Sequence, residues 1–137
     1  PTSGTITKRL GRSDADRKKM AVLPDDASRG KHAVTHFRTL KPLDGCTLIE
    51  CRLETGRTHQ VRVHLASIGH SLVGDPVYGR TTAHIRSILK DLGFERQALH
   101  AAVLGFVHPV TGEKLRFESE LPEDMKRLID ETAYSNR

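Results

Sequence analysis

The sequence predicts an α+β fold, in which helices pack on a mixed, mostly antiparallel sheet. Stretches of alternating apolar and polar residues occur in pairs that are joined by turn residues, which is typical of β-hairpins. Between and after these pairs, other segments carry apolar residues at helical spacing. The chain has 137 residues, which is enough for one domain and too few for two ordinary ones.

The first hairpin is predicted over residues 32–53. Residues 32–40 are rich in β-branched and aromatic side chains, and residues 46–53 alternate between apolar and charged ones. Residues 41–45 contain Pro and Asp-Gly, which supply the dihedral angles of a turn. These two strands are therefore expected to pair.

A second hairpin is predicted near the C-terminal end of the chain. Residues 98–107 are almost continuously apolar, which favours a strand buried on both faces. Residues 108–112 form the expected turn, and residues 114–119 alternate as a second strand.

Two helices accompany this hairpin. The first is predicted over residues 81–93, with Thr81 or Thr82 as its N-cap and Gly93 at its end. Its apolar stripe consists of Ile85, Ile88, Leu89 and Leu92. The second begins at Pro122, and its stripe consists of Met125, Leu128 and Ile129.

Residues 1–30 are predicted to be a basic, loop-rich arm, with at most short strands, one of them near residues 19–23, while residues 31–137 hold the sheet and the helices. Lys18 and Lys19 belong to a basic cluster in this arm and are candidates for contact with phosphate groups. The alternative interpretation is a solvated loop without a binding role.

The overall charge favours a polyanionic partner such as nucleic acid. Lys and Arg number 22 against 17 Asp and Glu, and the formal net charge is +5. An ordinary basic soluble protein would also fit. No apolar run reaches the roughly 20 residues of a membrane helix, so no membrane partner is expected. Cys46 and Cys51 would lie on opposite strand faces, and free thiols fit a cytoplasmic protein.

Residues 53–79 concentrate the chemistry of the chain. A helix is predicted over residues 59–68, with Thr58 as its N-cap, Gly69 at its end, and Val61, Leu65 and Ile68 packed on the sheet. At its N-terminus we expect the basic side chains of Arg57, His59 and Arg62 to converge on an anion.

The nature of that anion stays open from the residues alone. It could be an RNA phosphate or a carboxylate of the protein itself, and the same residues could form only a basic helix face. A metal site is not expected, because His59 and His64 lie on different helix faces and no Cys or carboxylate has ligand spacing beside them. Asp75 stands between Gly74 and Pro76, where a role in a turn is sufficient to explain it.

Several runs together resemble the RluA family of RNA pseudouridine synthases, in particular the enzymes of large-subunit rRNA. The main match is the run L-E-T-G-R-T-H-Q-V-R-V-H-L at residues 53–65. The further matches are residues 17–22, 33–38, 69–79, 96–101 and 108–113, with Ser71 where proline is usual. The resemblance extends over nearly the whole chain from about Gly4.

This resemblance implies an enzyme that isomerises uridine to pseudouridine in RNA, with ribosomal RNA as the expected substrate. It implies no cofactor and no metal. It implies that Arg62 pairs with the catalytic Asp and that Leu99 forms an apolar wall near the base. Arg57, His59 and Gln60 would shape the same cleft and bind RNA.

One departure from the family is clear, because the sequence contains no H-R-L-D motif with the catalytic Asp. The resemblance then implies the C-terminal half of a catalytic domain, inactive alone and completed by the N-terminal half of the same enzyme. Unpaired sheet edges would favour association with that half or self-association. The alternatives are a non-catalytic RNA-binding module and a small basic scaffold protein.

Overall fold

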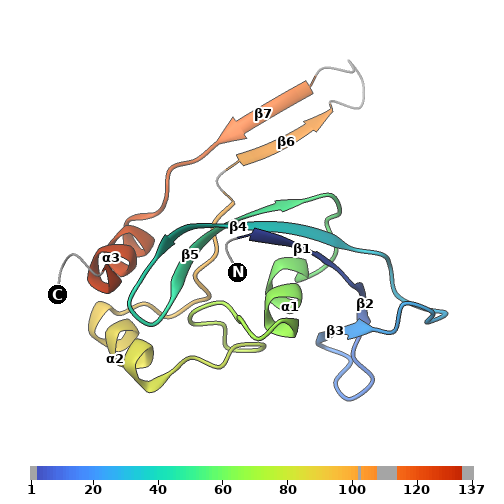
Figure 1. The fold of residues 1–137 in the computed structure, drawn as a ribbon, viewed down its shortest axis with the longest axis horizontal. Coiled ribbons are helices and arrows are strands. Elements are labelled where there is room, and N and C mark those ends of the chain that lie inside the picture. Colours follow the sequence, from blue (N-terminus) through green and yellow to red (C-terminus); the bar gives the residue numbers. More distant parts are fainter. Residues whose placement is uncertain (1–2, 102, 108–113, 134–137) are drawn as a thin grey trace.

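The computed structural model describes residues 3–101, 103–107 and 114–133, and it has an α+β fold with antiparallel strand pairs (Figure 1). This confirms the predicted class. The elements are β1 (Ser3–Thr7), β2 (Arg9–Arg12), β3 (Met20–Leu23), β4 (Val34–Pro42), β5 (Thr47–Leu53), α1 (Gln60–Ser67), α2 (Ala83–Leu92), β6 (Val103–Val107), β7 (Lys114–Glu118) and α3 (Glu123–Thr132). No helix in this described part of the chain has the length and apolarity that crossing a bilayer requires.

The largest sheet has the strand order β1-β4-β5, with both pairs antiparallel. The hairpin of β4 and β5 is the one that the alternation pattern predicted. Its turn is closed by the Leu43 N–H, which donates to the Cys46 carbonyl oxygen, and Gly45 takes the positive φ of 83°. A register shift between Thr39 and Lys41 bends the pair near this turn.

The first 30 residues contain more regular structure than predicted. The expected strand near residues 19–23 is present as β3, but β1 and β2 are also strands. β1 pairs with β4, and β2 pairs with β3. The apolar side chains explain this order, because Ile6 and Leu10 are only 4% and 2% exposed and belong to the core.

The predicted helix after β5 is present as α1, but its N-cap and its buried face differ from the prediction. The N-cap is His59 and not Thr58, and no side chain caps the helix. Val61 and Ile68 are only partly buried. The buried positions are Gln60, Val63, His64 and Leu65. Hydrogen bonds explain why this side of the helix faces inward, because Gln60 and His64 both bond to the buried Thr35 of β4.

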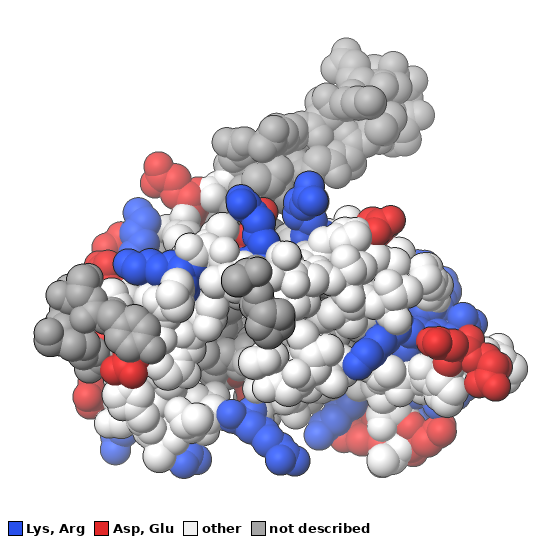
Figure 2. Space-filling model, in the orientation of Figure 1, with Lys and Arg blue, Asp and Glu red and all other residues white. Residues whose placement is uncertain are grey.

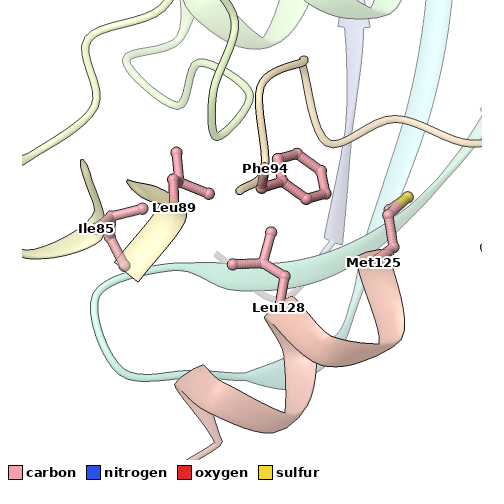
Figure 3. Packing of buried hydrophobic residues seen from close by; sticks show 5 residues of the cluster. All are labelled: Ile85, Leu89, Phe94, Met125 and Leu128. Atoms are coloured by element: carbon pink, nitrogen blue, oxygen red, sulfur yellow. The ribbon is translucent and has the colours of Figure 1, made fainter. Parts of the chain in front are cut away.

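α2 and α3 are present as predicted, and their apolar stripes pack against each other. The Thr82 hydroxyl accepts from the Ile85 N–H at the start of α2, and Gly93 ends the helix with φ 67°. The buried cluster between the helices consists of Ile85, Leu89, Phe94, Met125 and Leu128. Figure 3 shows Leu89, Phe94 and Leu128 pointing toward one another.

The second predicted hairpin is present as the antiparallel pair β6 and β7. Its first strand begins at Val103 and not at residue 98, and the described part of it pairs with β7 alone. Residues 98–101 instead run beside another loop, where the Ala98 N–H donates to the Val73 carbonyl oxygen. The predicted turn at residues 108–112, and the family match at residues 108–113, lie outside the described residues.

Candidate active site

A pocket of about 430 Å³ opens where the end of β5, the start of α1 and residues 97–99 meet. Its lining residues are Leu53, Arg57, His59, Gln60, Val61, Arg62, Gln97 and Leu99. All five predicted site residues from the central and C-terminal runs are therefore brought together at one place. The two predicted lysines of the N-terminal arm do not line it.

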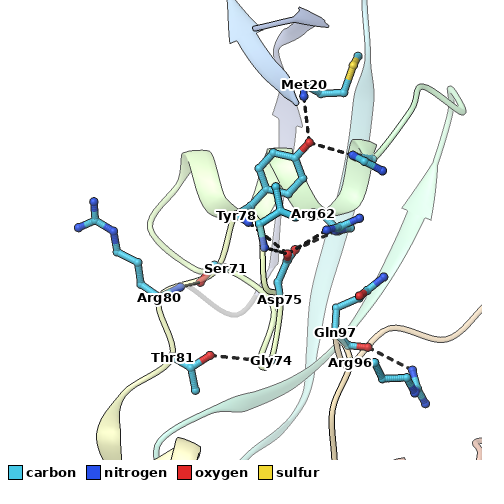
Figure 4. A network of polar contacts seen from close by, with 12 residues as sticks. Met20, Arg62, Ser71, Gly74, Asp75, Tyr78, Arg80, Thr81, Arg96 and Gln97 are labelled. Carbon is cyan, nitrogen blue, oxygen red and sulfur yellow. Dashed lines mark hydrogen bonds and ion pairs between the residues drawn. The ribbon is translucent and has the colours of Figure 1, made fainter. Parts of the chain in front are cut away.

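Arg62 forms a two-pronged ion pair with Asp75 (Figure 4). Its Nε lies 2.9 Å from Asp75 Oδ2, and its Nη2 lies 3.0 Å from Oδ1. The two side chains are 11% and 0% exposed. Of the partners that the residues alone left open for Arg62, the one present in this chain is thus a carboxylate of the protein itself.

Asp75 also holds the turn in which it lies. Its Oδ1 accepts hydrogen bonds from the backbone N–H groups of Val77 and Tyr78, at 2.9 and 3.1 Å. Burial would raise the pKa of the Asp75 carboxyl, but the hydrogen bonds from Arg62 and from these two N–H groups outweigh it and lower the pKa. The same contact raises the pKa of Arg62, so both groups are ionised at neutral pH. The predicted turn role of Asp75 is confirmed, and the pairing with Arg62 adds to it.

Tyr78 contacts two of the three basic residues that line the pocket, Arg62 and His59. The centre of its ring lies 5.0 Å from the Arg62 guanidinium carbon. The ring also packs edge-on against the His59 ring, with 5.6 Å between the two ring centres. Its hydroxyl lies 2.8 Å from His59 Nδ1 and accepts from the Met20 N–H at 2.9 Å. Sequence reasoning assigned no role to Tyr78. The only available signal was its place three residues after Asp75 in the family-like run.

His59 has an unusual backbone conformation. Its φ of 54° is left-handed, and among the described residues every other positive φ belongs to glycine. Such a conformation costs on the order of 1–3 kcal/mol and is common at functional sites. Desolvation, followed by the charge of Arg62, lowers the pKa of the His59 ring, so the ring is neutral at neutral pH.

Gln60 and Arg57 differ in what they leave for a ligand. The Gln60 amide is 2% exposed, and its carbonyl oxygen accepts from the Thr55 hydroxyl and the Arg57 N–H. Its NH₂ group donates to the Val34 carbonyl oxygen and to Thr35 Oγ1. Its polar atoms are thus occupied within the chain. Arg57 uses Nε for the His32 carbonyl oxygen, which anchors its side chain beside the pocket.

The apolar part of the pocket comes from two leucines. Leu53 is 47% exposed and Leu99 is 39% exposed, so both present hydrocarbon to the opening. Leu53 ends the strand that was predicted over residues 46–53. The segment before Leu99 lies against Gly74, where a Cβ atom would sit 2.3 Å from the Arg96 carbonyl oxygen. Only glycine permits this approach.

The basic residues of the N-terminal arm have mixed roles. Lys18 and Lys19 lie in the exposed loop between β2 and β3. That hairpin is joined to the site through the hydrogen bond from Met20 to Tyr78. Lys8 instead bonds Ser67 at the end of α1. On the face shown in Figure 2, Lys and Arg lie around the edge and do not form one continuous patch.

Comparison with known proteins gives the same class as the resemblance. The family profile described as RNA pseudouridylate synthase matches residues 1–67. The ribosomal large subunit pseudouridine synthase D of Zymomonas mobilis is 55% identical over 134 residues, which cover 98% of this chain and 42% of that protein. The uncharacterized RNA pseudouridine synthase YlyB of Bacillus subtilis is 52% identical over 127 residues, 93% of this chain and 38% of that protein.

A solved structure, human RNA pseudouridylate synthase domain containing 1, superposes with a TM-score of 0.69 at 27% identity. The match covers 88% of this chain and 49% of that one. Fold and relatives thus place the chain in the class of RNA pseudouridine synthases. The chain belongs to the RluA family of these enzymes. It spans about two fifths of the length of the curated relatives that it matches.

Proposed function

We propose that this chain is part of an RNA pseudouridine synthase that isomerises uridine to pseudouridine in large-subunit ribosomal RNA. The observation that carries the proposal is the pocket in which Arg57, His59, Arg62 and Leu99 meet beside the Arg62–Asp75 pair. The names of the relatives from Zymomonas mobilis and other bacteria support ribosomal RNA as the substrate.

Arg62 is the residue that we expect to hold the catalytic carboxylate. A guanidinium has five N–H donors, and Asp75 engages the edge formed by Nε and Nη2. The Nη1 edge makes no hydrogen bond with the described residues, so it can hold a second carboxylate. This sequence contains no H-R-L-D segment. The second carboxylate would then come from the remaining part of the enzyme, with Asp75 fixing Arg62 in advance.

The rest of the pocket suits an extruded base. Enzymes that act on a base within RNA bind it outside the stack, between apolar or aromatic side chains. Leu53 and Leu99 supply such surface, and the pocket volume of about 430 Å³ lies within the range of small-ligand sites. Arg57 and the lysines Lys18 and Lys19 would contact the phosphates around it.

The same proposal includes a partner segment and a location. In the three-stranded sheet of the described residues, β1 and β5 are the edge strands, and an unpaired edge readily accepts another strand. We expect the N-terminal half of the enzyme to cover these edges, and the isolated chain to self-associate when that half is missing. We expect the complete enzyme to act in the cytoplasm. Light scattering after gel filtration tests this, and a stable monomer would contradict the self-association.

A segment exchange tests the function directly. This chain replaces the matching 134-residue segment of the Zymomonas mobilis relative, and the chimera is expressed in a strain that lacks the corresponding synthase. Primer extension after carbodiimide treatment then measures pseudouridine in large-subunit rRNA. We expect the chimera to restore the modification and the isolated chain to give none.

Two variants sharpen this test. Arg62→Ala should lower the rate of the chimera about 100-fold or more, in the range seen when a group that stabilises the reacting charge is removed. Arg86→Ala, at an exposed position of α2, is the matched control and should leave the rate unchanged. A folded but inactive chimera would contradict the proposal. If the chain then still bound RNA in a salt-sensitive manner, it would be a non-catalytic RNA-binding module.

A further inference from the structure

The contact between Tyr78 and His59 determines where the protons lie in this part of the pocket. The Met20 backbone N–H can only donate, so the Tyr78 oxygen accepts from it. If His59 Nδ1 also donated to that oxygen, the phenolic proton would have no acceptor among the described residues. When Nδ1 accepts instead, the Met20 N–H and the phenolic proton of Tyr78 both have an acceptor. The His59 ring is then the tautomer that carries its proton on Nε2.

The Nε2–H group of this tautomer is unused by the chain. No hydrogen bond joins Nε2 to any described residue, and the ring lines the pocket. Desolvation most strongly, and then the charge of Arg62, disfavour a second proton on the ring, which lowers its pKa although the charge of Asp75 has a smaller opposite effect. The ring therefore offers one neutral N–H donor to the pocket, beside the neutral side-chain amide of Gln97 and the cationic groups of Arg57 and Arg62.

Capping of α1 does not account for a histidine at this position. The φ of 54° at the N-cap would suit glycine or asparagine without strain. The ring makes no capping hydrogen bond to α1. His59 thus combines a strained backbone with a ring that Tyr78 holds in one orientation. This combination is expected where a side chain must be held in one place for function.

We propose that His59 donates a hydrogen bond from Nε2 to an acceptor oxygen of the RNA in the pocket, and that Tyr78 is the positioning residue that fixes the required tautomer. This rests on the proposed function, because it requires RNA in the pocket. The acceptor is a uracil carbonyl oxygen or a phosphodiester oxygen, and both would accept the same N–H.

The tautomer is tested on the 137-residue chain labelled with ¹⁵N-histidine. We expect His59 to show an unprotonated Nδ1 and a protonated Nε2 at neutral pH. Tyr78→Phe keeps the ring that packs on Arg62 and His59 but removes the hydroxyl, and it should convert His59 to a mixture of tautomers. Exposed His70 serves as the internal reference and should not change. A wild-type ring protonated on Nδ1 would overturn the proposal.

The same spectra identify the acceptor. Uridine and inorganic phosphate are titrated separately into the labelled chain while the Nε2 resonance of His59 is followed. A shift with uridine alone assigns a base carbonyl, and a shift with phosphate alone assigns a phosphodiester oxygen. The absence of a shift with both overturns the donor role.

The chimera described above supplies the kinetic test. His59→Gly removes the ring and accepts the left-handed backbone, and it should lower kcat/KM about tenfold, as expected for one lost hydrogen bond. His59→Gln places an amide N–H near the position of Nε2 and should recover part of this loss. His70→Gln is the control. Wild-type kcat/KM in His59→Gly would overturn the proposal, whereas an inactive wild-type chimera would count against the proposed function alone.

Discussion

The two helical regions of this molecule are buried by different means. α2 and α3 meet through hydrocarbon, in the cluster of Ile85, Leu89, Phe94, Met125 and Leu128. The inner side of α1 buries polar groups as well as Val63 and Leu65, and Gln60 and His64 are both bonded to Thr35. His64 Nε2 donates to the Lys8 carbonyl oxygen, and its Nδ1 accepts from the Thr35 hydroxyl.

The two kinds of contact differ in how firmly they fix the orientation of a helix. A hydrocarbon contact tolerates small rotations, whereas hydrogen bonds at 2.8–2.9 Å fix a helix in one rotation. α1 is the helix that carries Arg62 into the pocket, with His59 at its N-cap. The hydrogen-bonded polar groups on its inner side therefore fix the positions of two donors that make no hydrogen bond within the described residues, His59 Nε2 and Arg62 Nη1. The following experiments test this contrast.

The largest effect is expected where a buried charge loses its partner. Asp75→Ala leaves Arg62 nearly buried without a carboxylate and frees the turn N–H groups of Val77 and Tyr78. We expect the free energy of unfolding to fall by about 3–5 kcal/mol in urea denaturation. Asp91→Ala, at an exposed position of α2, is the control and should change it by less than about 0.5 kcal/mol. A loss below about 1 kcal/mol would show that the pair is not a structural anchor.

A cavity in the apolar region should follow. Leu128 is 6% exposed, and Leu128→Ala should destabilise the chain by about 3 kcal/mol through lost burial and an unfilled cavity. Leu40→Ala, at a position that is 49% exposed, should cost less than about 1 kcal/mol in the same urea titration. Equal losses for both variants would contradict the assigned core.

The polar region should be sensitive to pH, and the apolar region should not. Burial lowers the pKa of His64 in the folded chain, and that of His59 is lowered too. Because the unfolded chain then binds more protons, stability should fall as pH drops below about 6.5. Urea midpoints at pH 8, 7, 6 and 5 measure this.

A matched pair of variants assigns that pH dependence. His64→Gln should reduce it, and His59 should account for what remains. His70→Gln, at an exposed position, should keep the full dependence. A midpoint that is constant or rises between pH 7 and pH 5 would be inconsistent with a neutral buried His64.

The smallest effect compares two threonines that each precede a helix. Thr82 caps α2, so Thr82→Ala should cost about 1 kcal/mol. Thr58 makes no cap, since His59 occupies that position in α1. Thr58→Ala should therefore change stability by less than about 0.5 kcal/mol in thermal or urea denaturation. A cost for Thr58→Ala as large as that for Thr82→Ala would restore Thr58 as the cap.

The same contrast explains what could be predicted from the sequence. Apolar spacing located α2 and α3 and the hairpin of β4 and β5, because hydrocarbon burial leaves a periodic trace. α1 left no such trace on its inner side, where Gln60 and His64 are polar. β1 and β2 were not predicted because both are short and contain glycine, and β2 also carries two arginines.

For the site, family-like runs named the residues, but not their partners. Arg62 and Asp75 are thirteen positions apart, and the contact from Met20 to Tyr78 spans 58 positions. Such pairs have no periodic or local signal, so the roles of Asp75 and Tyr78 required the folded chain. The left-handed backbone of His59 was equally inaccessible, because histidine is not a residue that indicates it.

The close contact of Gly74 with Arg96 has a consequence for how this pocket can change through evolution. The turn that orients Arg62 and the segment that carries Leu99 touch through backbone atoms, and the Val73 carbonyl oxygen bonds the Ala98 N–H at 2.8 Å. The cationic and apolar walls thus form one rigid frame. Relatives that act on different uridines would be expected to diversify through side chains at its rim, since a loop insertion here would displace both walls together.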